Sequence, residues 1–354
     1  MNKPADWPLL PDEVKRRRDG MRFTLGFEPS TNGDGAAFAV WRQRMRDAWA
    51  GAVRFLGGVP EVDLTTERRV DGFRQVPLVM RFADGASTRG ILQLPEGSGP
   101  FPGILLLHDH GGEFRIGWRK VASAPEEHLS PIAEAARTRH YGGIPPATTL
   151  TRAGFAVLVL DAFGWGSRQT GEWGGQQALA ANLMQLGQTP AELVAAEDVA
   201  AADWLARQDF IDAGRVGAFG FSFGGFRAWQ VAALSPSVRA FCSFSWMARR
   251  LMLLQDGNSL TRGQSAFWML HPALSALADF PDMAGAAAPK PALFRCGDAD
   301  PHMPVAAVEA AYRDLAGIWS AAGGQLDAAI ETGGHTLPTD RQETGAAFLS
   351  GALG

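Results

Sequence analysis

Short, uninterrupted apolar runs restrict the fold of this chain more than any other feature. PGILLLHDH (102–110) and GFAVLVLDA (154–162) show no polar alternation, which is typical of strands buried on both faces. Similar runs predict further strands at 215–219, 238–246, 291–298 and 325–332. Helical segments such as 189–209 and 305–324 lie between most of these runs. Buried strands that alternate with helices predict an α/β fold with a mostly parallel sheet flanked by helices.

The first part of the chain follows other patterns. Residues 1–34 are rich in proline, glycine and charge and predict an irregular arm. Residues 35–57 predict a helix whose apolar face must dock on its own domain or on a second subunit, so a homodimer is possible. That face is formed by Phe38, Trp41, Met45, Trp49 and Val53. Segments 73–82 and 87–95 flank a turn and predict an antiparallel pair of strands at one edge of the sheet.

These patterns divide the chain into two parts. We expect an N-terminal arm and helix at 1–60 and a catalytic domain at 61–354. Two stretches within that domain, about 111–150 and 247–285, interrupt the alternation of strands and helices. We interpret both as insertions over the carboxyl ends of the strands, where such loops often form the walls of a substrate site.

Composition excludes several classes of partner. The net charge of −4 gives no reason to expect nucleic acid or an anionic membrane. The N-terminal segment has no apolar core of a secretory signal, and no apolar run reaches the roughly 18 residues that span a bilayer. We therefore predict a cytoplasmic protein. The two cysteines, Cys242 and Cys296, predict buried thiols rather than a disulfide framework.

A glycine-rich motif marks a candidate nucleophile. Ser222 is the central residue of GFSFG, which follows a predicted strand and precedes a predicted helix. This strand–turn–helix context is the one a nucleophile elbow requires, with small residues at 220 and 224 that let strand and helix approach. We predict that Ser222 is a catalytic nucleophile.

A serine nucleophile needs a base that a third group positions. In this type of sheet the acid and the histidine should follow the serine along the chain, at later strand ends. Three histidines follow it, and we favour His335 in ETGGHTLP over His271 and His302. For the acid we favour Asp300 over Asp298, since Asp300 lies in the loop beyond the strand end and could hold one histidine tautomer.

The loop after the 102–110 strand supplies further candidates. An oxyanion hole needs backbone N–H groups, for which we predict Phe223 together with His110 or Gly111. The neighbouring His108 and His110 also suggest a metal site, but no carboxylate or thiolate cluster completes it. We therefore expect no metal, and side chains that instead hold the loop by hydrogen bonds.

Two more residues are candidates for substrate binding. Trp246 ends the 238–246 strand, and Arg249 and Arg250 follow it. An arginine at this strand end could bind a substrate carboxylate through two hydrogen bonds. Ion pairing within the protein is the alternative for either arginine, including a buried pair with Asp109.

Together these motifs resemble a known family. HDHGG, the LVLDAFGWGSR segment, the approach to the elbow at 209–217, GFSFGG, GDADPHMP and GGH are similar to the α/β-hydrolase superfamily over about residues 70–352. Within it the chain most resembles dienelactone hydrolase-like and acetyl xylan esterase-like members. Dienelactone hydrolases proper carry a cysteine at the elbow, so Ser222 favours a serine esterase instead.

We therefore predict a carboxylic-ester hydrolase that forms an acyl-enzyme on a small-molecule ester. No dinucleotide glycine motif follows a strand, and we expect no cofactor. A serine peptidase of the same fold and a non-catalytic binding module are the alternatives.

Overall fold

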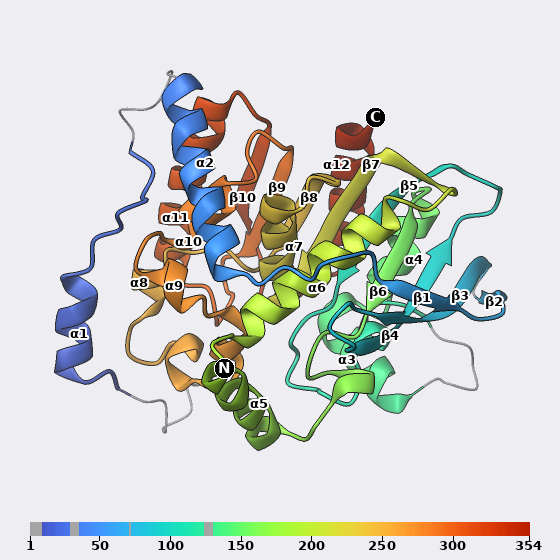
Figure 1. The fold of residues 1–354 in the computed structure, drawn as a ribbon, viewed down its shortest axis with the longest axis horizontal. Coiled ribbons are helices and arrows are strands. Elements are labelled where there is room, and N and C mark those ends of the chain that lie inside the picture. The colour runs from blue at the N-terminus through green and yellow to red at the C-terminus, as the bar shows by residue number, and fades with distance from the viewer. Residues whose placement is uncertain (1–8, 29–34, 71, 124–129) are drawn as a thin grey trace.

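A single mixed sheet forms the centre of the protein (Figure 1). The structure, a computed structural model, describes residues 9–28, 35–70, 72–123 and 130–354. The strand order is β1-β3-β4-β6-β5-β7-β8-β9-β10, with β2 paired to β3. The strands are β1 (Glu61–Leu64), β2 (Arg68–Val70), β3 (Phe73–Arg81), β4 (Ser87–Leu94), β5 (Phe101–Leu107), β6 (Ala156–Leu160), β7 (Ile211–Phe221), β8 (Val238–Phe244), β9 (Ala292–Gly297) and β10 (Leu326–Glu331).

The six strands from β5 to β10 are parallel, and the four before them pair antiparallel. The predicted fold class is therefore confirmed. The β3–β4 pair is antiparallel as expected, but β1 lies beyond it and forms the edge. The sequence gives little signal for β1 and β2, because both strands are short and largely exposed, and the polar–apolar alternation of β1 spans only four residues.

The helices cover both faces of the sheet (Figure 1). Helix α6 begins with a capping box at Thr189, as its Thr-Pro pair predicts, and α11 ends at Gly323 in the left-handed region. The helices are α1 (Asp12–Asp19), α2 (Gly35–Ala52), α3 (Pro131–Tyr141), α4 (Pro146–Arg152), α5 (Trp173–Gln185), α6 (Pro190–Leu205), α7 (Phe223–Leu234), α8 (Arg250–Leu253), α9 (Pro272–Ser275), α10 (Phe280–Gly285), α11 (Val305–Ala322) and α12 (Thr339–Leu353). Short 3-10 helices occur at Trp118–Lys120, Gly166–Arg168, Ser259–Arg262 and Gln264–Met269.

Two hydrophobic cores lie on opposite faces of the sheet. Along β5, Leu105 and Leu107 belong to the core shared with α6 and α7, while Ile104 and Leu106 belong to the core shared with α4 and α12. Alternate residues of a strand point to opposite faces, so a strand buried on both faces must be apolar throughout. This explains the uninterrupted apolar runs of the sequence. Cys242 and Cys296 are buried and free, as predicted.

The apolar face of α2 packs on its own chain. The five side chains predicted for this face are all buried, and α2 contacts α7, α9, α10 and α11. That face is therefore not available to a second subunit. Within the predicted arm, residues 12–19 form helix α1, while 1–8 and 29–34 lie outside the described residues. Acidic residues in the first turn of α1 and basic residues in its last turn favour a helix without a buried face.

The two predicted insertions contain helices. Segment 111–150 includes α3 and α4, and α4 packs against β4, β6 and α12. Segment 247–285 includes α8, α9 and α10. Within the described ranges, none of the helices combines the length and apolar character that crossing a membrane requires.

Candidate active site

Ser222 occupies a sharp turn between β7 and α7. Its backbone has φ 56° and ψ −124°, a conformation that residues other than glycine rarely adopt. The flanking glycines make the turn possible. A Cβ on Gly220 would overlap the carbonyl group of Gly224, and a Cβ on Gly224 would overlap the carbonyl oxygen of Leu107 in β5. The predicted elbow is therefore present, and close backbone contacts require its glycines.

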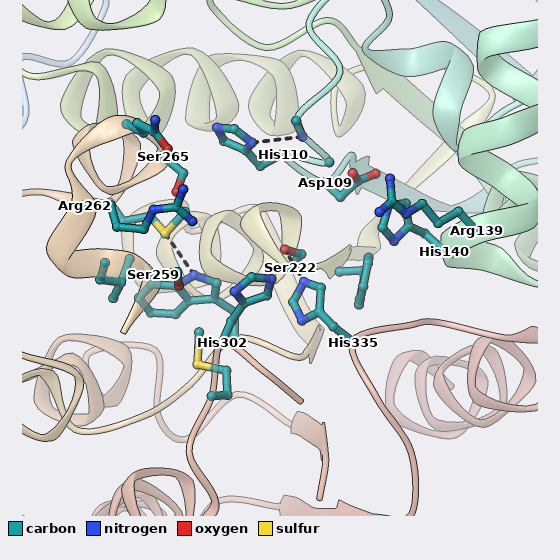
Figure 2. A pocket seen from close by; sticks show the side chains of 18 of the residues that line it. Asp109, His110, Arg139, His140, Ser222, Ser259, Arg262, Ser265, His302 and His335 are labelled. Atoms are coloured by element: carbon teal, nitrogen blue, oxygen red, sulfur yellow. Dashed lines mark hydrogen bonds between the residues drawn. The ribbon is translucent and has the colours of Figure 1, made fainter. Parts of the chain in front are cut away.

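Three side chains from separate loops form one hydrogen-bonded chain. The Oγ atom of Ser222 lies 2.8 Å from Nε2 of His335, and Nδ1 of His335 lies 2.6 Å from Oδ2 of Asp300. Asp300 follows β9 and His335 follows β10, so the loops meet at the carboxyl edge of the sheet. Figure 2 shows His335 beside Ser222. Burial alone would raise the pKa of Asp300, but His335 and the backbone N–H of His302 outweigh it and lower that pKa. Asp300 is thus a charged partner for the imidazole.

The alternative acid and bases lie elsewhere or bond differently. Asp298 accepts the backbone N–H of Gly333 at 2.9 Å and belongs to the turn. His271 is buried next to Trp49, with Nε2 2.7 Å from Oε1 of Gln230.

His302 lies beside His335, and the two ring centroids are 4.7 Å apart. Burial and the neighbouring His335 lower the pKa of His302 to about 4. His302 is therefore a neutral imidazole next to the hydrogen-bonded chain at neutral pH.

The histidines of the loop after β5 hold its shape. His108 is fully buried, its Nδ1 donates to the carbonyl oxygen of Asp109 at 2.8 Å, and its Nε2 accepts the N–H of Ala162 at 3.0 Å. Nδ1 of His110 accepts the N–H of Gly112 at 3.2 Å. The structural role predicted for these histidines is confirmed. Among the described residues, no group of three or more metal-ligating side chains is suited to a metal ion.

Three backbone N–H groups near Ser222 are without a hydrogen-bond partner among the described residues: those of His110, Gly111 and Phe223. His110 and Gly111 line the same cavity as Ser222. Phe223 is the residue after Ser222 in the chain. Phe223 is the first residue of α7, where N–H groups have no acceptor within the helix. These are the three amides that the sequence suggested for an oxyanion hole.

The cavity around Ser222 and His335 has a volume of about 370 Å³. Both insertions supply its walls, and Figure 2 shows Arg139 and His140 on one side of Ser222 and Ser259, Arg262 and Ser265 on the other. Its lining residues are Asp109, His110, Gly111, Gly112, Arg139, His140, Trp173, Phe221, Ser222, Trp246, Ser259, Leu260, Arg262, Gln264, Ser265, Met269, His302, Met303 and His335. Among these described lining residues, Asp109 is the single carboxylate.

The two predicted substrate-binding residues differ in position. Trp246 lines the cavity, and its Nε1 donates to Sδ of Met269 at 3.0 Å. The prediction for Arg249 is wrong, because its guanidinium pairs with Asp314 at the surface and does not line this cavity. The arginine that follows it, Arg250, is buried and donates to the carbonyl oxygens of Ser275 and Ala278.

Sequence reasoning missed several cavity residues. Arg139 and His140 lie in the last turn of α3, and Trp173 begins α5, so no motif connects them to the serine. It also missed the partner of Asp109. That carboxylate accepts a hydrogen bond from Tyr141 and lies 3.7 Å from Nζ of Lys120. The partner of Asp109 is therefore Lys120 and not Arg249 or Arg250.

Known proteins share this fold. A protein from Bacteroides fragilis NCTC 9343 assigned as an acetyl xylan esterase superimposes with a TM-score of 0.71 at 16% identity, over 92% of this chain and 84% of that one. A glucuronoyl esterase from Solibacter usitatus gives a TM-score of 0.67 at 14% identity, over 99% and 100% of the two chains. At such identities the likeness shows the fold.

Sequence comparison adds the family. YtaP of Bacillus subtilis (strain 168), assigned as a hydrolase, is 23% identical over 225 residues, which are 64% of this chain and 69% of YtaP. The model of the X-Pro dipeptidyl-peptidase (S15) family matches residues 84–276, more than half of the chain. This stretch contains the β5 loop, the elbow and most of the second insertion. The chain therefore belongs to the X-Pro dipeptidyl-peptidase (S15) family, within the α/β-hydrolase superfamily.

Proposed function

We propose that this hydrolase cleaves carboxylic esters through Ser222, His335 and Asp300. The observation that carries the proposal is the continuous hydrogen-bonded chain from Ser222 through His335 to Asp300. Ser222 and His335 line the cavity, where a substrate can reach them. A serine hydroxyl becomes an effective nucleophile only when a base accepts its proton and a third group orients that base.

The geometry supports a two-step acyl transfer. Ser222 Oγ attacks the ester carbonyl while its proton passes to Nε2 of His335, and Asp300 stabilises the resulting imidazolium. The amides of Phe223 and of His110 or Gly111 hold the developing oxyanion. His335 returns the proton to the leaving alkoxide, and the alcohol departs. Water then attacks the acyl-enzyme with His335 as base, which releases the acid and regenerates Ser222.

A peptidase is the second candidate, because the matching family model describes X-Pro dipeptidyl-peptidases. Recognition of a free peptide N-terminus requires a carboxylate for the ammonium group. Among the described lining residues Asp109 is the single carboxylate, and it is buried and bonded to Tyr141 beside Lys120. The described part of the cavity lining thus presents no accessible carboxylate, which favours the ester.

The cavity wall also bears on the substrate class. Trp173 and Trp246 offer ring surfaces, and two of the histidines, His110 and His302, have pKa values lowered to about 3 and about 4. Burial is the main cause of both shifts. Neutral imidazoles beside aromatic rings suit a hydroxyl-rich ligand. Since the solved relatives are named as acetyl xylan and glucuronoyl esterases, we propose an ester of a carbohydrate or a similar polyol.

Two assays test the proposal. A fluorophosphonate should label the wild-type protein and should not label Ser222→Ala. p-Nitrophenyl acetate and acetylated xylose should be hydrolysed faster than an Xaa-Pro p-nitroanilide. Faster cleavage of the anilide would favour the peptidase, and a folded wild-type protein that neither labels nor hydrolyses either substrate would favour the non-catalytic binding module.

A further inference from the structure

We propose that Lys120 is a positioning residue that aims and polarises the two loop amides of the oxyanion hole. The proposal rests on the esterase function above. It concerns the loop after β5, where His110 and Gly111 contribute unbonded N–H groups to the cavity wall.

Lys120 lies directly behind this loop. It ends the 3-10 helix Trp118–Lys120 in the first insertion, and its side chain is fully buried. Its Nζ donates to the carbonyl oxygen of Asp109 at 3.1 Å and to that of His110 at 2.9 Å. One ammonium group therefore bonds to two successive peptide groups, whose carbonyl oxygens also accept hydrogen bonds from Nδ1 of His108 and Nε1 of Trp165.

The geometry of a peptide determines where the other ends point. In a planar trans peptide, the C=O of one residue and the N–H of the next point in opposite directions. The carbonyl of Asp109 shares its peptide with the N–H of His110, and the carbonyl of His110 shares its peptide with the N–H of Gly111. Because Lys120 holds both carbonyls, both N–H groups must point away from it. A cation bound to a carbonyl also polarises the amide, which makes its N–H a stronger donor.

The charge of Lys120 is balanced within the same cluster. The Asp109 carboxylate lies 3.7 Å from Nζ and accepts a hydrogen bond from Tyr141. Burial alone would raise the pKa of Asp109, but Lys120, His140 and Tyr141 outweigh it and lower that pKa to about 2. Burial lowers the pKa of Lys120 in turn. A Cβ on Gly111 would overlap the Asp109 carboxylate, so the loop is shaped around this ion pair.

A buried ion pair contributes little net stability compared with apolar residues of similar volume. Stability alone therefore does not account for this pair directly behind the candidate oxyanion hole.

A second lysine, Lys290, is half-buried and provides a control with similar hydrogen bonding. Nζ of Lys290 also donates to two backbone carbonyls, those of Ala232 and Ser235 at the end of α7, at 2.6 Å and 2.7 Å. Lys290 does not line the cavity. Its bonding resembles that of Lys120, but no amide of the candidate oxyanion hole belongs to the peptides it holds.

The test compares Lys120→Met, Lys290→Met and the double variant Lys120→Met/Asp109→Asn. Lys120→Met alone leaves the buried Asp109 carboxylate without its cation and could misfold. The double variant replaces that carboxylate with a neutral amide and so removes this problem. With p-nitrophenyl acetate, we expect kcat to fall about 10- to 100-fold in both Lys120 variants, while KM changes less than about threefold. This loss is smaller than the roughly 10²- to 10³-fold loss caused by removing one oxyanion donor, because the amides are weakened and not removed. An alkylboronic acid, which forms a tetrahedral anion on Ser222, should bind more weakly by a similar factor. Binding of the neutral alcohol product should not change.

Lys290→Met should lose thermal stability and keep its kcat. A Lys120 variant or double variant that is folded by circular dichroism and keeps wild-type kcat and boronate affinity would overturn the inference. The esterase proposal would still stand in that case if a fluorophosphonate labelled the wild-type protein and did not label Ser222→Ala. Equal weakening of boronate and product binding would also overturn the inference, because it would indicate a general structural role. A wild-type protein that hydrolyses no ester would instead remove the proposed function itself.

Discussion

At the scale of single residues, the backbone of Ser222 is the most unusual feature of the site. Its φ of 56° is shared, among described residues other than glycine, only by Ser245 and Gln264 with similar positive values. The N–H of Ser222 donates to the carbonyl oxygen of Phe244 at 2.8 Å, and its own carbonyl accepts the N–H of Phe226 at 3.0 Å. The neighbouring strand and the first turn of α7 thus hold the residue in a conformation that costs on the order of 1–3 kcal/mol.

This strain predicts a difference between two inactive variants. Ser222→Gly and Ser222→Ala both remove the hydroxyl, but only glycine adopts the positive φ without a steric penalty. We expect Ser222→Gly to be about 1 kcal/mol more stable than Ser222→Ala, even though glycine gains entropy in the unfolded chain. Urea unfolding of the two variants measures this difference. A Ser222→Ala variant of equal or greater stability would show that the turn is not strained.

The two aspartates of the β9 loop allow a second prediction at this scale. Asp300→Asn keeps the shape of the side chain but favours the wrong imidazole tautomer, so kcat should fall roughly 10³- to 10⁴-fold with little change in KM. Asp298→Asn should keep kcat within a few-fold, because an amide oxygen still accepts the N–H of Gly333. Steady-state kinetics on an ester decides, and a larger loss in Asp298→Asn would reverse the assignment of the acid.

At the scale of elements, the site depends on how closely α7 approaches β5. Gly224 lies against the carbonyl oxygen of Leu107, and Leu107 is the last residue of β5 before the oxyanion loop. Any side chain at 224 therefore separates the helix that begins with Phe223 from the loop that holds His110. The distance between the proposed oxyanion donors is set by this contact.

Alanine substitutions test this contact. Gly224→Ala should lower the free energy of unfolding by about 1–3 kcal/mol through overpacking, and should lower kcat as well. Gly317→Ala is the control, because Gly317 lies inside α11 with nothing within 4 Å of the added methyl. Alanine should stabilise that helix by up to about 1 kcal/mol. Chemical denaturation and ester kinetics measure both effects, and a Gly224→Ala protein of wild-type stability and activity would contradict the argument.

At the scale of the whole molecule, buried histidines couple folding to pH. Burial lowers the pKa of His110 and of His271 to about 3, and that of His302 to about 4. In the unfolded chain these groups titrate near 6.5. Between pH 6.5 and 4 the unfolded state therefore binds more protons than the folded state. Each of these histidines therefore makes the free energy of unfolding fall with decreasing pH, with a slope of up to about 1.4 kcal/mol per pH unit.

Several carboxyls act in the opposite direction, because burial raises the pKa values of Asp161, Glu192, Glu197, Asp198, Asp279 and Asp282. Burial raises the pKa of Asp282 to about 6, so its contribution to stability is greatest at low pH and is lost between about pH 4 and 6. Asp282 offsets the contribution of about one histidine over that range, and comparing a histidine variant with the wild type cancels the contributions of these carboxyls. His271→Gln should reduce the pH slope by the share of one histidine, as measured by urea unfolding at pH 4.5, 5.5 and 6.5. An unchanged slope would show that His271 does not titrate on unfolding.

The sequence by itself determined the alternation of elements and the positions of the candidate triad. Strands buried on both faces must be apolar throughout, and a strained elbow must be flanked by glycines, so Ser222, Asp300 and His335 could be assigned from local pattern and chain order. Such requirements act on neighbouring residues and leave a mark in the sequence.

Only the tertiary structure decided the surroundings of that triad. It paired Asp109 with Lys120 and Tyr141, took Arg249 away to Asp314, and brought Arg139 to the cavity wall. It also covered the apolar face of α2 with helices that come much later in the chain. A charged side chain pairs with whichever opposite charge the packed elements bring within a few ångströms. That distance depends on how whole helices and loops pack, and no spacing along the chain encodes it.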